Sequence, residues 1–515
     1  MVRFGILFIL LVLSACDNAP STGTPPDTGA PTVVQDLLEG DIALTPDPHG
    51  IAPLTAEAVF NTKTPVRVTL TVPGEERVTQ TFPAATEHRI PILGLYPDTD
   101  NQVTLRLESD EGAAETTLSV ITDPLPEEFP AVSIITADRD EIEPGWNLNS
   151  FRLRDTPERA SPFMYDPRGV IRWYLDLPVS GRTSSPERVA NGNLIYGFES
   201  TLYEYDMLGE KVNQWESPGY RYHHEIVEKP NGNLIVAVDK EGLDTIEDFV
   251  IEVDRETGEI VSEWDFRESL DVDRQTFDDD EEDWLHMNAI FYDERDDTLI
   301  ISGRVQGLAK VTADNELVWI LAPHKGWGEN GDGEDTADYL LTAVDADSDP
   351  YPEAVQQGDE DAPDFSWVWG QHAPLILPNG NLFVFDNGEN RNFSSNGDFT
   401  QDSPSFSRGV EYAIDEEALT VEQVWQYGKA RGEAFYSPII SDVDYLPETG
   451  NRLIMPGIIS VFSPPSYALM TEVTYPGKEV VFEARLEFKN LLEGDSIFGD
   501  SIYRAERLPL YPDAQ

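Results

Sequence analysis

The sequence predicts an all-β protein in which a six-bladed β-propeller follows a small N-terminal β-sandwich of the fibronectin type III-like kind. Two observations predict the propeller: a hairpin turn recurs in five segments, and a strand that ends in an aromatic residue recurs in six. Strand-rich units of about 40 to 80 residues with tight turns are typical of propeller blades. A third observation, short alternating strands between residues 37 and 125, predicts the sandwich.

The N-terminus has the features of an exported lipoprotein. A short apolar run follows Arg3 and ends in small residues before Cys16, which is typical of a signal peptide with a bacterial lipobox. We expect a periplasmic lipoprotein that is anchored to a bacterial membrane through lipid on Cys16; an uncleaved anchor helix is the alternative. Cys16 is the only cysteine, so the mature chain can form no internal disulfide.

The chain therefore divides into four expected segments. The residues after Cys16 are rich in Pro, Gly and Thr and have nothing to bury, which predicts a flexible tether. The segments are a signal peptide at 1–16, the tether at 17–36, the β-sandwich at 37–125 and the propeller at 126–515.

The charge of the chain limits its partners. Asp and Glu number 96 against 35 Lys and Arg, a net charge of −61, and the acidic residues are dispersed along the chain. This balance argues against nucleic acid or an anionic lipid surface as a partner and favours a solvated or salt-adapted surface. An anionic substrate must then find a local cationic pocket.

The repeats define the blades. The hairpin turns lie in VANGN, KPNGN, RDDTL, LPNGN and PETGN. The strand-ending aromatic residues are Trp173, Trp215, Trp264, Trp319, Trp425 and Phe482. A seventh blade in FSPPSYALM or at the C-terminus is the alternative to six, and we expect the terminal SIYRAERLPLY to return and pair with the first blade.

Histidines recur at one position of the repeat. His224 and His372 each lie seven residues before the Asn of an Asn-Gly turn, Ser184 and Asp442 take the same position in other units, and His286 occupies the equivalent strand start. Because the first strand of each blade lines the central channel, we expect the three histidines to face one another. His223 is the less favoured alternative to His224 as the channel-facing residue.

Two further polar residues accompany the histidines. Arg304 ends the strand after His286, and Asn288 shares the face of His286 by strand alternation. Three histidines could hold Zn²⁺ or Fe²⁺, but a guanidinium repels a cation and suits an oxyanion, so we expect no metal and no cofactor. The set fits a sulfuryl or phosphoryl group, and a neutral imidazole is a competent nucleophile.

The spans HHEIVEKPNGNL, DWLHMNAIFYDERDDTLIISGR and QHAPLILPNGNLFVFDNG, together with the segment from VEYAIDEEALTVEQVW to PETGNRLI, resemble the bacterial aryl sulfotransferases that work without the nucleotide sulfate donor. The resemblance implies a six-bladed propeller with a small N-terminal β-domain, a phenolic sulfate donor, a phenol acceptor, a ping-pong reaction and a possible homodimer. It implies that His372 is the transiently sulfated nucleophile and that His286 and Arg304 hold the sulfuryl oxygens. Asn288 is then the neighbouring amide, and His224 or His223 the remaining histidine.

Two other functions remain open from the sequence. One is a surface-tethered propeller that binds a ligand or a metal, and the other is an aryl sulfate hydrolase that uses water as the acceptor. The acidic run FDDDEEDW before His286 is expected to be a solvated loop.

Overall fold

The structure, a computed structural model, describes residues 33–110, 112–153, 159–177, 184–274, 276, 280–389, 391, 406–460, 465–489 and 500–512. The expected signal peptide, the lipid attachment residue Cys16 and most of the tether lie outside the described residues. No helix within the described ranges is long and apolar enough to span a membrane.

The N-terminal domain is a β-sheet that follows helix α1 (Val34–Leu37). Its strands are β1 (Leu38–Pro46), β2 (Ala56–Val72), β3 (Val78–Ile92), β4 (Asp100–Ser109) and β5 (Gly112–Ile121). The all-β domain expected at 37–125 is present, and its five strands are joined by pairing into one sheet. The reason is the long strand β2, which pairs with β1 in its first half and with β4 in its second, with irregular register between Asn61 and Val68.

The rest of the described chain forms six sheets of four or five strands each. The first sheet contains β7 (Trp146–Leu153), β8 (Arg159–Ala160), β9 (Phe163–Tyr165), β10 (Ile171–Tyr174) and β32 (Ser501–Leu508). The second contains β11 (Glu187–Arg188), β12 (Leu194–Phe198), β13 (Thr201–Tyr205) and β14 (Lys211–Glu216). The third contains β15 (Tyr220–Glu228), β16 (Leu234–Lys240), β17 (Phe249–Val253) and β18 (Ile260–Asp265).

The remaining three sheets follow in chain order. The fourth contains β19 (Met287–Asp293), β20 (Thr298–Gly303), β21 (Gly307–Thr312) and β22 (Leu317–Leu321). The fifth contains β23 (Thr342–Ala343), β24 (His372–Ile376), β25 (Leu382–Asp386), β26 (Arg408–Asp415) and β27 (Thr420–Tyr427). The sixth contains β28 (Asp442–Tyr445), β29 (Arg452–Met455), β30 (Tyr467–Val473), β31 (Val480–Glu487) and β6 (Ala131–Ala137). The short helices are α2 (Phe266–Ser269), α3 (Glu353–Gln356), η1 (Thr336–Tyr339) and η2 (Lys429–Phe435).

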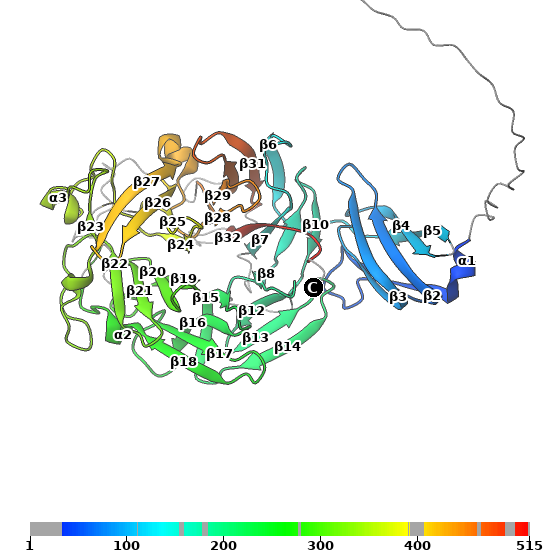
Figure 1. The fold of residues 1–515 in the computed structure, drawn as a ribbon, viewed down its shortest axis with the longest axis horizontal. Helices are drawn as coiled ribbons and strands as arrows, with labels where there is room; N and C mark the ends of the chain where they lie inside the picture. Colours follow the sequence, from blue (N-terminus) through cyan, green and yellow to red (C-terminus); the bar gives the residue numbers. More distant parts are fainter. Residues whose placement is uncertain are drawn as a thin grey trace, which may run out of the picture.

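The six sheets follow one another around a common centre, beside the N-terminal domain (Figure 1). The strand-ending aromatic residues predicted from the repeats are all buried. Five of them are tryptophans whose Nε1 donates a hydrogen bond to the next sheet in chain order: Trp173 to Met207, Trp215 to Arg255, Trp264 to Thr312, Trp319 to Glu416 and Trp425 to Pro476. The recurring tryptophan therefore links each of the first five sheets to its successor.

The recurring Asn-Gly turns have a structural cause. Gly192, Gly232 and Gly380 have φ of 86°, 88° and 89°, a conformation that glycine adopts without steric cost. The side-chain amide of the Asn that follows the glycine donates a hydrogen bond to a glutamate on the strand that comes after the hairpin. The pairs are Asn193 with Glu204, Asn233 with Glu252 and Asn381 with Glu411. The repeated motif thus stabilises the turn of each hairpin. The turn is the end of the hairpin that lies away from the histidines.

The two ends of the ring are joined by strand pairing. The C-terminal strand β32 pairs with β7 in the first sheet, which confirms the expected return of SIYRAERLPLY. In the opposite direction, β6 pairs with β31 in the sixth sheet. The segment considered for a seventh blade contributes β30 to this sixth sheet.

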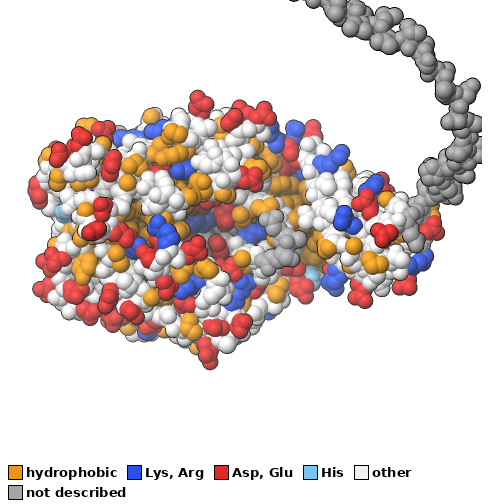
Figure 2. Space-filling view, in the orientation of Figure 1, with side chains coloured by type: hydrophobic (Ala, Val, Ile, Leu, Met, Phe, Trp, Pro, Cys, Tyr) orange, Lys and Arg blue, Asp and Glu red, His pale blue; other side chains and the backbone are white. Residues whose placement is uncertain are grey.

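Acidic side chains are spread over the face of the molecule that Figure 2 shows, and Lys and Arg side chains are visible in a recess near the centre of the ring. This distribution agrees with the expectation of a dispersed acidic surface and a local cationic pocket.

We expect Trp264→Phe to lower the stability of the protein by about 1 kcal/mol, because the variant loses the bond from Nε1 to the Thr312 carbonyl at 3.0 Å. The measurement is the apparent melting temperature by differential scanning fluorimetry. Val261→Ala on the same strand is the control, since Val261 is 51% exposed. Equal melting temperatures for Trp264→Phe and wild type would show that this link between sheets contributes nothing.

Candidate active site

The three predicted histidines lie in or directly before the first strands of three successive sheets: His224 in the middle of β15, His286 directly before β19 and His372 at the start of β24. Each of these strands has an irregular register beside its histidine, between Tyr222 and Ile226, between Met287 and Ala289, and between His372 and Leu375. Such bulges redirect side chains and are common beside active sites. His224 and His286 themselves have φ of 46° and 49°, the left-handed region that residues other than glycine seldom occupy.

The structure brings the three histidines together around Tyr503 of β32. The ring centroid of His224 lies 5.9 Å from that of His286 and 5.6 Å from that of Tyr503, and the His372 centroid lies 6.0 Å from Tyr503. The repeat position therefore predicts proximity correctly for His224, His286 and His372. Tyr503 was missed, because the C-terminal strand shows no repeat motif that would place it in register.

His372 is held in one tautomer by Asn387. The His372 Nδ1 lies 2.8 Å from Asn387 Oδ1 and 3.1 Å from the Gly370 carbonyl oxygen. The Asn387 amide nitrogen donates to the carbonyls of Ser437 and Ile440, which fixes its oxygen toward the histidine. Because both neighbours of Nδ1 are acceptors, Nδ1 carries the hydrogen and Nε2 carries the lone pair. Nε2 is therefore the nitrogen of this ring that can act as a nucleophile.

Burial lowers the pKa of His372 well below its ordinary value, and the nearby positive charges of Arg504 and Arg304 lower it further. The hydrogen bond with Asn387 acts in the opposite direction without offsetting this effect. The imidazole is consequently neutral near pH 7, as a nitrogen nucleophile must be.

The lowered pKa of His372 gives a testable pH dependence for the role that the resemblance implies for this residue, the uptake of a sulfuryl group. Since the neutral imidazole is the reactive form, the rate of the first step should stay constant as the pH falls from 8 through 6.5, and should decline only at lower pH. The measurement is the rate of nitrophenol release from p-nitrophenyl sulfate in a single turnover, with each sample made alkaline before its absorbance is read. A half-maximal rate at pH 6.5 or above would contradict a lowered pKa of the nucleophile.

Arg304 offers a buried donor to an anion. Its Nη2 lies 2.5 Å from Glu389 Oε2, and its backbone nitrogen donates to the His286 carbonyl at 3.0 Å. Its Nε is buried and has no hydrogen-bond partner among the described residues. A buried N–H of this kind is costly unless a ligand accepts from it, so it marks a place for an oxyanion.

Asn288 lies at the bulge of β19 and connects two parts of the site. Its side-chain nitrogen donates to the carbonyl of Gln371, the residue before His372, at 2.9 Å. Its own carbonyl accepts from the Tyr503 hydroxyl at 2.7 Å and from Arg504 Nη2 at 3.3 Å. The fully buried Asn288 therefore positions the His372 strand and the C-terminal strand.

Arg504 supplies a second cation that the sequence argument did not identify. It forms a buried ion pair with Glu225, and Nη1 donates to the Ser441 carbonyl at 3.0 Å. The positive charge of Arg504 contributes to lowering the pKa of His372, so Arg504 lies within electrostatic reach of that histidine.

His223 and His224 take different positions. The His223 side chain is fully buried, whereas that of His224 is 11% exposed and lies against Tyr503 and His286. This arrangement favours His224 as the residue that meets the substrate. Both histidines contact each other through their Nδ1 atoms at 2.9 Å.

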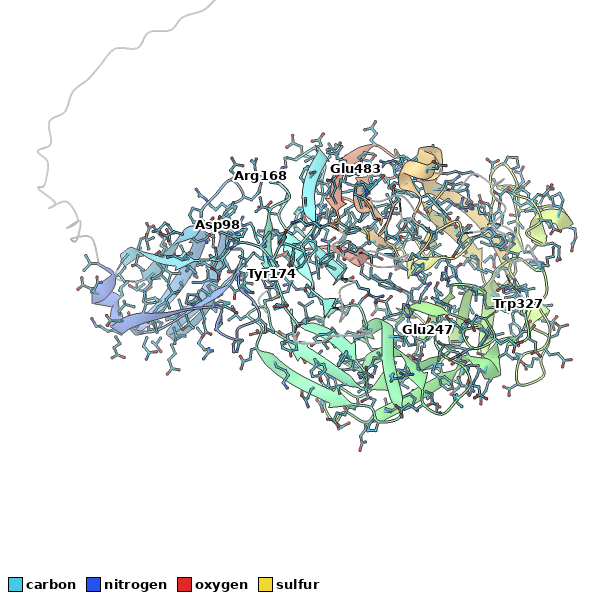
Figure 3. The ribbon with its side chains drawn as sticks, turned by 180° about the vertical axis from the view of Figure 1, so that it is seen from behind. Asp98, Arg168, Tyr174, Glu247, Trp327 and Glu483 are labelled. Atoms are coloured by element: carbon cyan, nitrogen blue, oxygen red, sulfur yellow. The ribbon has the colours of Figure 1, made fainter. Side chains whose placement is uncertain are left out.

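The acidic run before His286 is not wholly solvated, which corrects that expectation. Asp283 Oδ2 lies 2.5 Å from His286 Nδ1, and Trp284 is buried. The run leads directly into β19, and its last two residues contact His286 and the hydrophobic core, respectively. Glu247 was also missed; it lies near the middle of the ring of sheets (Figure 3), with Oε2 3.7 Å from His286 Nε2.

The sequence matches the arylsulfotransferase (ASST) family over residues 114–495 and the arylsulfotransferase Ig-like domain over residues 43–124. Two proteins named arylsulfate sulfotransferase AssT, from Escherichia coli and Lelliottia amnigena, are each 28% identical to this chain, covering 86% of it and 89% of their own length. A solved structure of a protein of unknown function from Bacteroides caccae is 13% identical and covers 50% of this chain and 93% of its own. Its TM-score of 0.25 is too low to support an argument. The family match spans well over half of the chain, so the protein belongs to the arylsulfotransferase (ASST) family.

Proposed function

We propose that this protein is an aryl sulfotransferase that moves a sulfuryl group from a phenolic sulfate ester to an acceptor phenol through a sulfohistidine on His372. Family membership and the two relatives named arylsulfate sulfotransferase support the sulfotransferase activity. The single observation that carries the mechanism is His372 itself: a neutral imidazole whose Nδ1 hydrogen is fixed by Asn387 and whose Nε2 holds the lone pair.

We further infer that the six sheets are the blades of a β-propeller that spans residues 126–515, after an N-terminal domain at 37–125. Four or five strands in each sheet, the ordered tryptophan bonds between successive sheets and the two strand pairings that join the ends support this interpretation.

In the first step, Nε2 of His372 attacks sulfur in line with the aryl oxygen. The new N–S bond forms as the S–O(aryl) bond breaks, and the phenolate departs. Arg304 and His286 bind the sulfuryl oxygens in this proposal, and Asn288 holds the strand that carries His372 in place. Arg304 Nε is the donor best placed for this purpose, because it is buried and lacks a partner among the described residues.

His224 gives a proton from Nε2 to the departing phenolate oxygen. We assign this role to His224 rather than His223 because the His223 side chain is fully buried, and rather than His286 because Asp283 engages the Nδ1 of that ring. In the second step the acceptor phenol attacks sulfur, the N–S bond breaks, and the phenol proton returns to His224. The enzyme is then restored without a cofactor.

The test is the fate of the sulfuryl group when the purified protein is mixed with p-nitrophenyl sulfate, with and without phenol. We expect nitrophenol release to accelerate on addition of phenol and phenyl sulfate to accumulate in equal amount. Release at one rate in both cases, with inorganic sulfate as the product, would assign a hydrolase. No release in either case would favour a binding protein.

The location of the protein is a separate proposal that rests on the sequence. The apolar run before Cys16 supports export to the periplasm and lipid attachment at that cysteine. Partition of the wild-type protein into a membrane fraction, and release of Cys16→Ala into the soluble fraction, is the expected result.

A further inference from the structure

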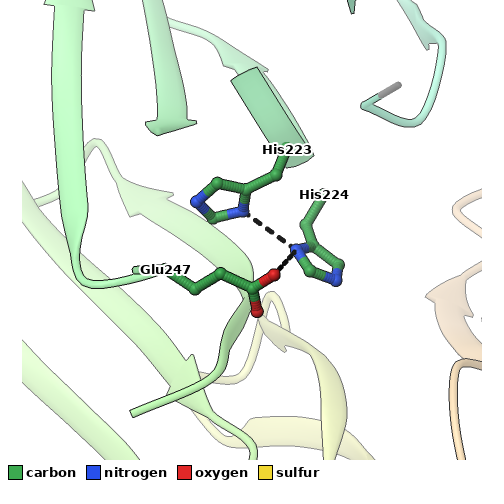
Figure 4. A group of neighbouring side chains, drawn as sticks. All are labelled: His223, His224 and Glu247. Carbon is green, nitrogen blue, oxygen red and sulfur yellow. Dashed lines mark hydrogen bonds and ion pairs between the residues drawn. The ribbon is translucent and has the colours of Figure 1, made fainter. Parts of the chain in front are cut away.

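Three side chains beside the active-site histidines form a compact cluster of nitrogen and oxygen atoms. His223 Nδ1 lies 2.9 Å from His224 Nδ1, and the latter atom lies 3.8 Å from Glu247 Oε1. Figure 4 shows that both contacts meet at the same ring nitrogen of His224. The possible ligand atoms of the three residues all lie within 4.8 Å of one another.

These spacings suit one metal ion. Zinc binds imidazole nitrogen and carboxylate oxygen at about 2.0 to 2.2 Å, and tetrahedral geometry then separates two ligand atoms by about 3.3 Å. Two of the three separations, 2.9 and 3.8 Å, lie on either side of this value, and the third is no more than 4.8 Å. Two imidazoles and one carboxylate are a common ligand set for zinc-class ions, whereas Ca²⁺ and Mg²⁺ prefer oxygen ligands.

The charge of the surroundings also favours a cation. The Glu247 side chain is only 1% exposed, and two more carboxylates face the same histidines: Asp239 beside His223 and Asp283 beside His286. The positive charges of Arg304 and Arg504, which would oppose a cation, are each paired with an acid, Glu389 and Glu225.

Asp239 lies beside two of the three residues of the cluster. Its Oδ1 accepts the backbone N–H of Glu247 at 2.9 Å and lies 3.8 Å from Nε2 of His223. Asp239 therefore holds the backbone of Glu247 and lies within ion-pair distance of His223, and a carboxylate near the far nitrogen of a histidine is the usual support of a metal-bound imidazole.

A second possible group, Glu247 with Asp283 and His286, is less suited to an ion. The ion pair of 2.5 Å between His286 Nδ1 and Asp283 already engages two of its three members. Glu247 Oε2 lies 3.7 Å from Nε2 of His286, and Oε1 faces His224, so Oε1 is the atom of Glu247 that we assign to the ion.

We propose that His223 Nδ1, His224 Nδ1 and Glu247 form a three-ligand site for one divalent transition-metal ion of the zinc class, with the fourth position open beside the partly exposed His224. The site goes beyond the proposed sulfuryl transfer. When an ion is bound to Nδ1 of His224, that nitrogen carries no proton. The hydrogen of the ring is then on Nε2, which can donate it toward the substrate.

The experiment is a titration of the purified protein with Co²⁺ after dialysis against a chelator. We expect visible absorption bands of four- or five-coordinate cobalt that saturate at one ion per chain and disappear on addition of Zn²⁺. Glu247→Gln, which keeps the shape of the side chain, should weaken Co²⁺ binding by more than about 100-fold, since loss of a ligand costs more than loss of a supporting residue. Asp283→Asn is the matched control: it removes a nearby charge but no ligand, so it should weaken Co²⁺ binding by less than about tenfold.

Circular dichroism of both variants checks that they are folded. Absence of a one-to-one cobalt signal from the wild-type protein would overturn the proposal. Equal weakening in Glu247→Gln and Asp283→Asn would also overturn it, because the ion would then lie in the second group. The cobalt signal does not depend on transfer from p-nitrophenyl sulfate, which is measured on the same samples, so failure of one proposal is distinguishable from failure of the other.

Discussion

Replacing His372 with asparagine is expected to lower kcat for sulfuryl transfer by at least about 10⁴-fold, because the side chain that forms the covalent bond to sulfur is lost. An asparagine amide can occupy the place of Nδ1 and keep the bond to Asn387, but it has no atom at the position of Nε2. The fold of the site should therefore survive while the reaction does not. The measurement is steady-state release of nitrophenol in the presence of phenol.

His324→Asn is the matched control for this variant. His324 lies outside the ring of three histidines, where its Nε2 contacts the Leu341 carbonyl at 3.0 Å. We expect its kcat to stay within about threefold of wild type. Activity of His372→Asn within tenfold of wild type would exclude His372 as the nucleophile.

Arg304→Met is expected to lower kcat/KM by about 10² to 10³-fold, the usual effect of removing one donor that faces developing negative charge. Methionine retains the length of the apolar stem and removes the guanidinium, including the buried Nε that lacks a partner among the described residues. Arg304→Lys should restore only part of the loss, because an ammonium is a point charge without the planar fork. The measurement is kcat/KM for p-nitrophenyl sulfate.

Arg255→Met is the control for the loss of an ion-paired arginine elsewhere in the ring of sheets. Arg255 pairs with Glu204 and Glu228 near the hairpin turns. We expect a change in stability but little change in kcat/KM. If Arg304→Met and Arg255→Met had equal effects on kcat/KM, Arg304 would have no special role in holding the sulfuryl group.

Much of the architecture could be predicted because its causes are local and repeated. The Asn-Gly turns require a left-handed residue at Gly192, Gly232 and Gly380, and the recurring tryptophans are the residues that link one sheet to the next. Residues at the same position of different repeats lie at equivalent positions in different sheets, close to the centre that the sheets surround. His224, His286 and His372 were for this reason correctly expected to meet.

The residues that sequence reasoning missed lie outside the repeat. Tyr503 and Arg504 reach the site because β32 crosses from the C-terminus to pair with β7, and Glu247 lies in the connection between β16 and β17. Asn387 follows directly after β25 in a segment already singled out for His372, but its contact depends on the bulge after that histidine. Contacts made through bulges and connections leave no periodic signal in a single sequence.

The most direct test of the central claim is the mass of the intact protein a few seconds after mixing with p-nitrophenyl sulfate in the absence of phenol, followed by fragmentation to locate the added group. The account predicts a gain of about 80 Da, the mass of one sulfuryl group, on His372, and its loss when phenol is added. A protein that releases nitrophenol and transfers sulfate to phenol without any mass gain, or with the gain on another residue, would contradict it.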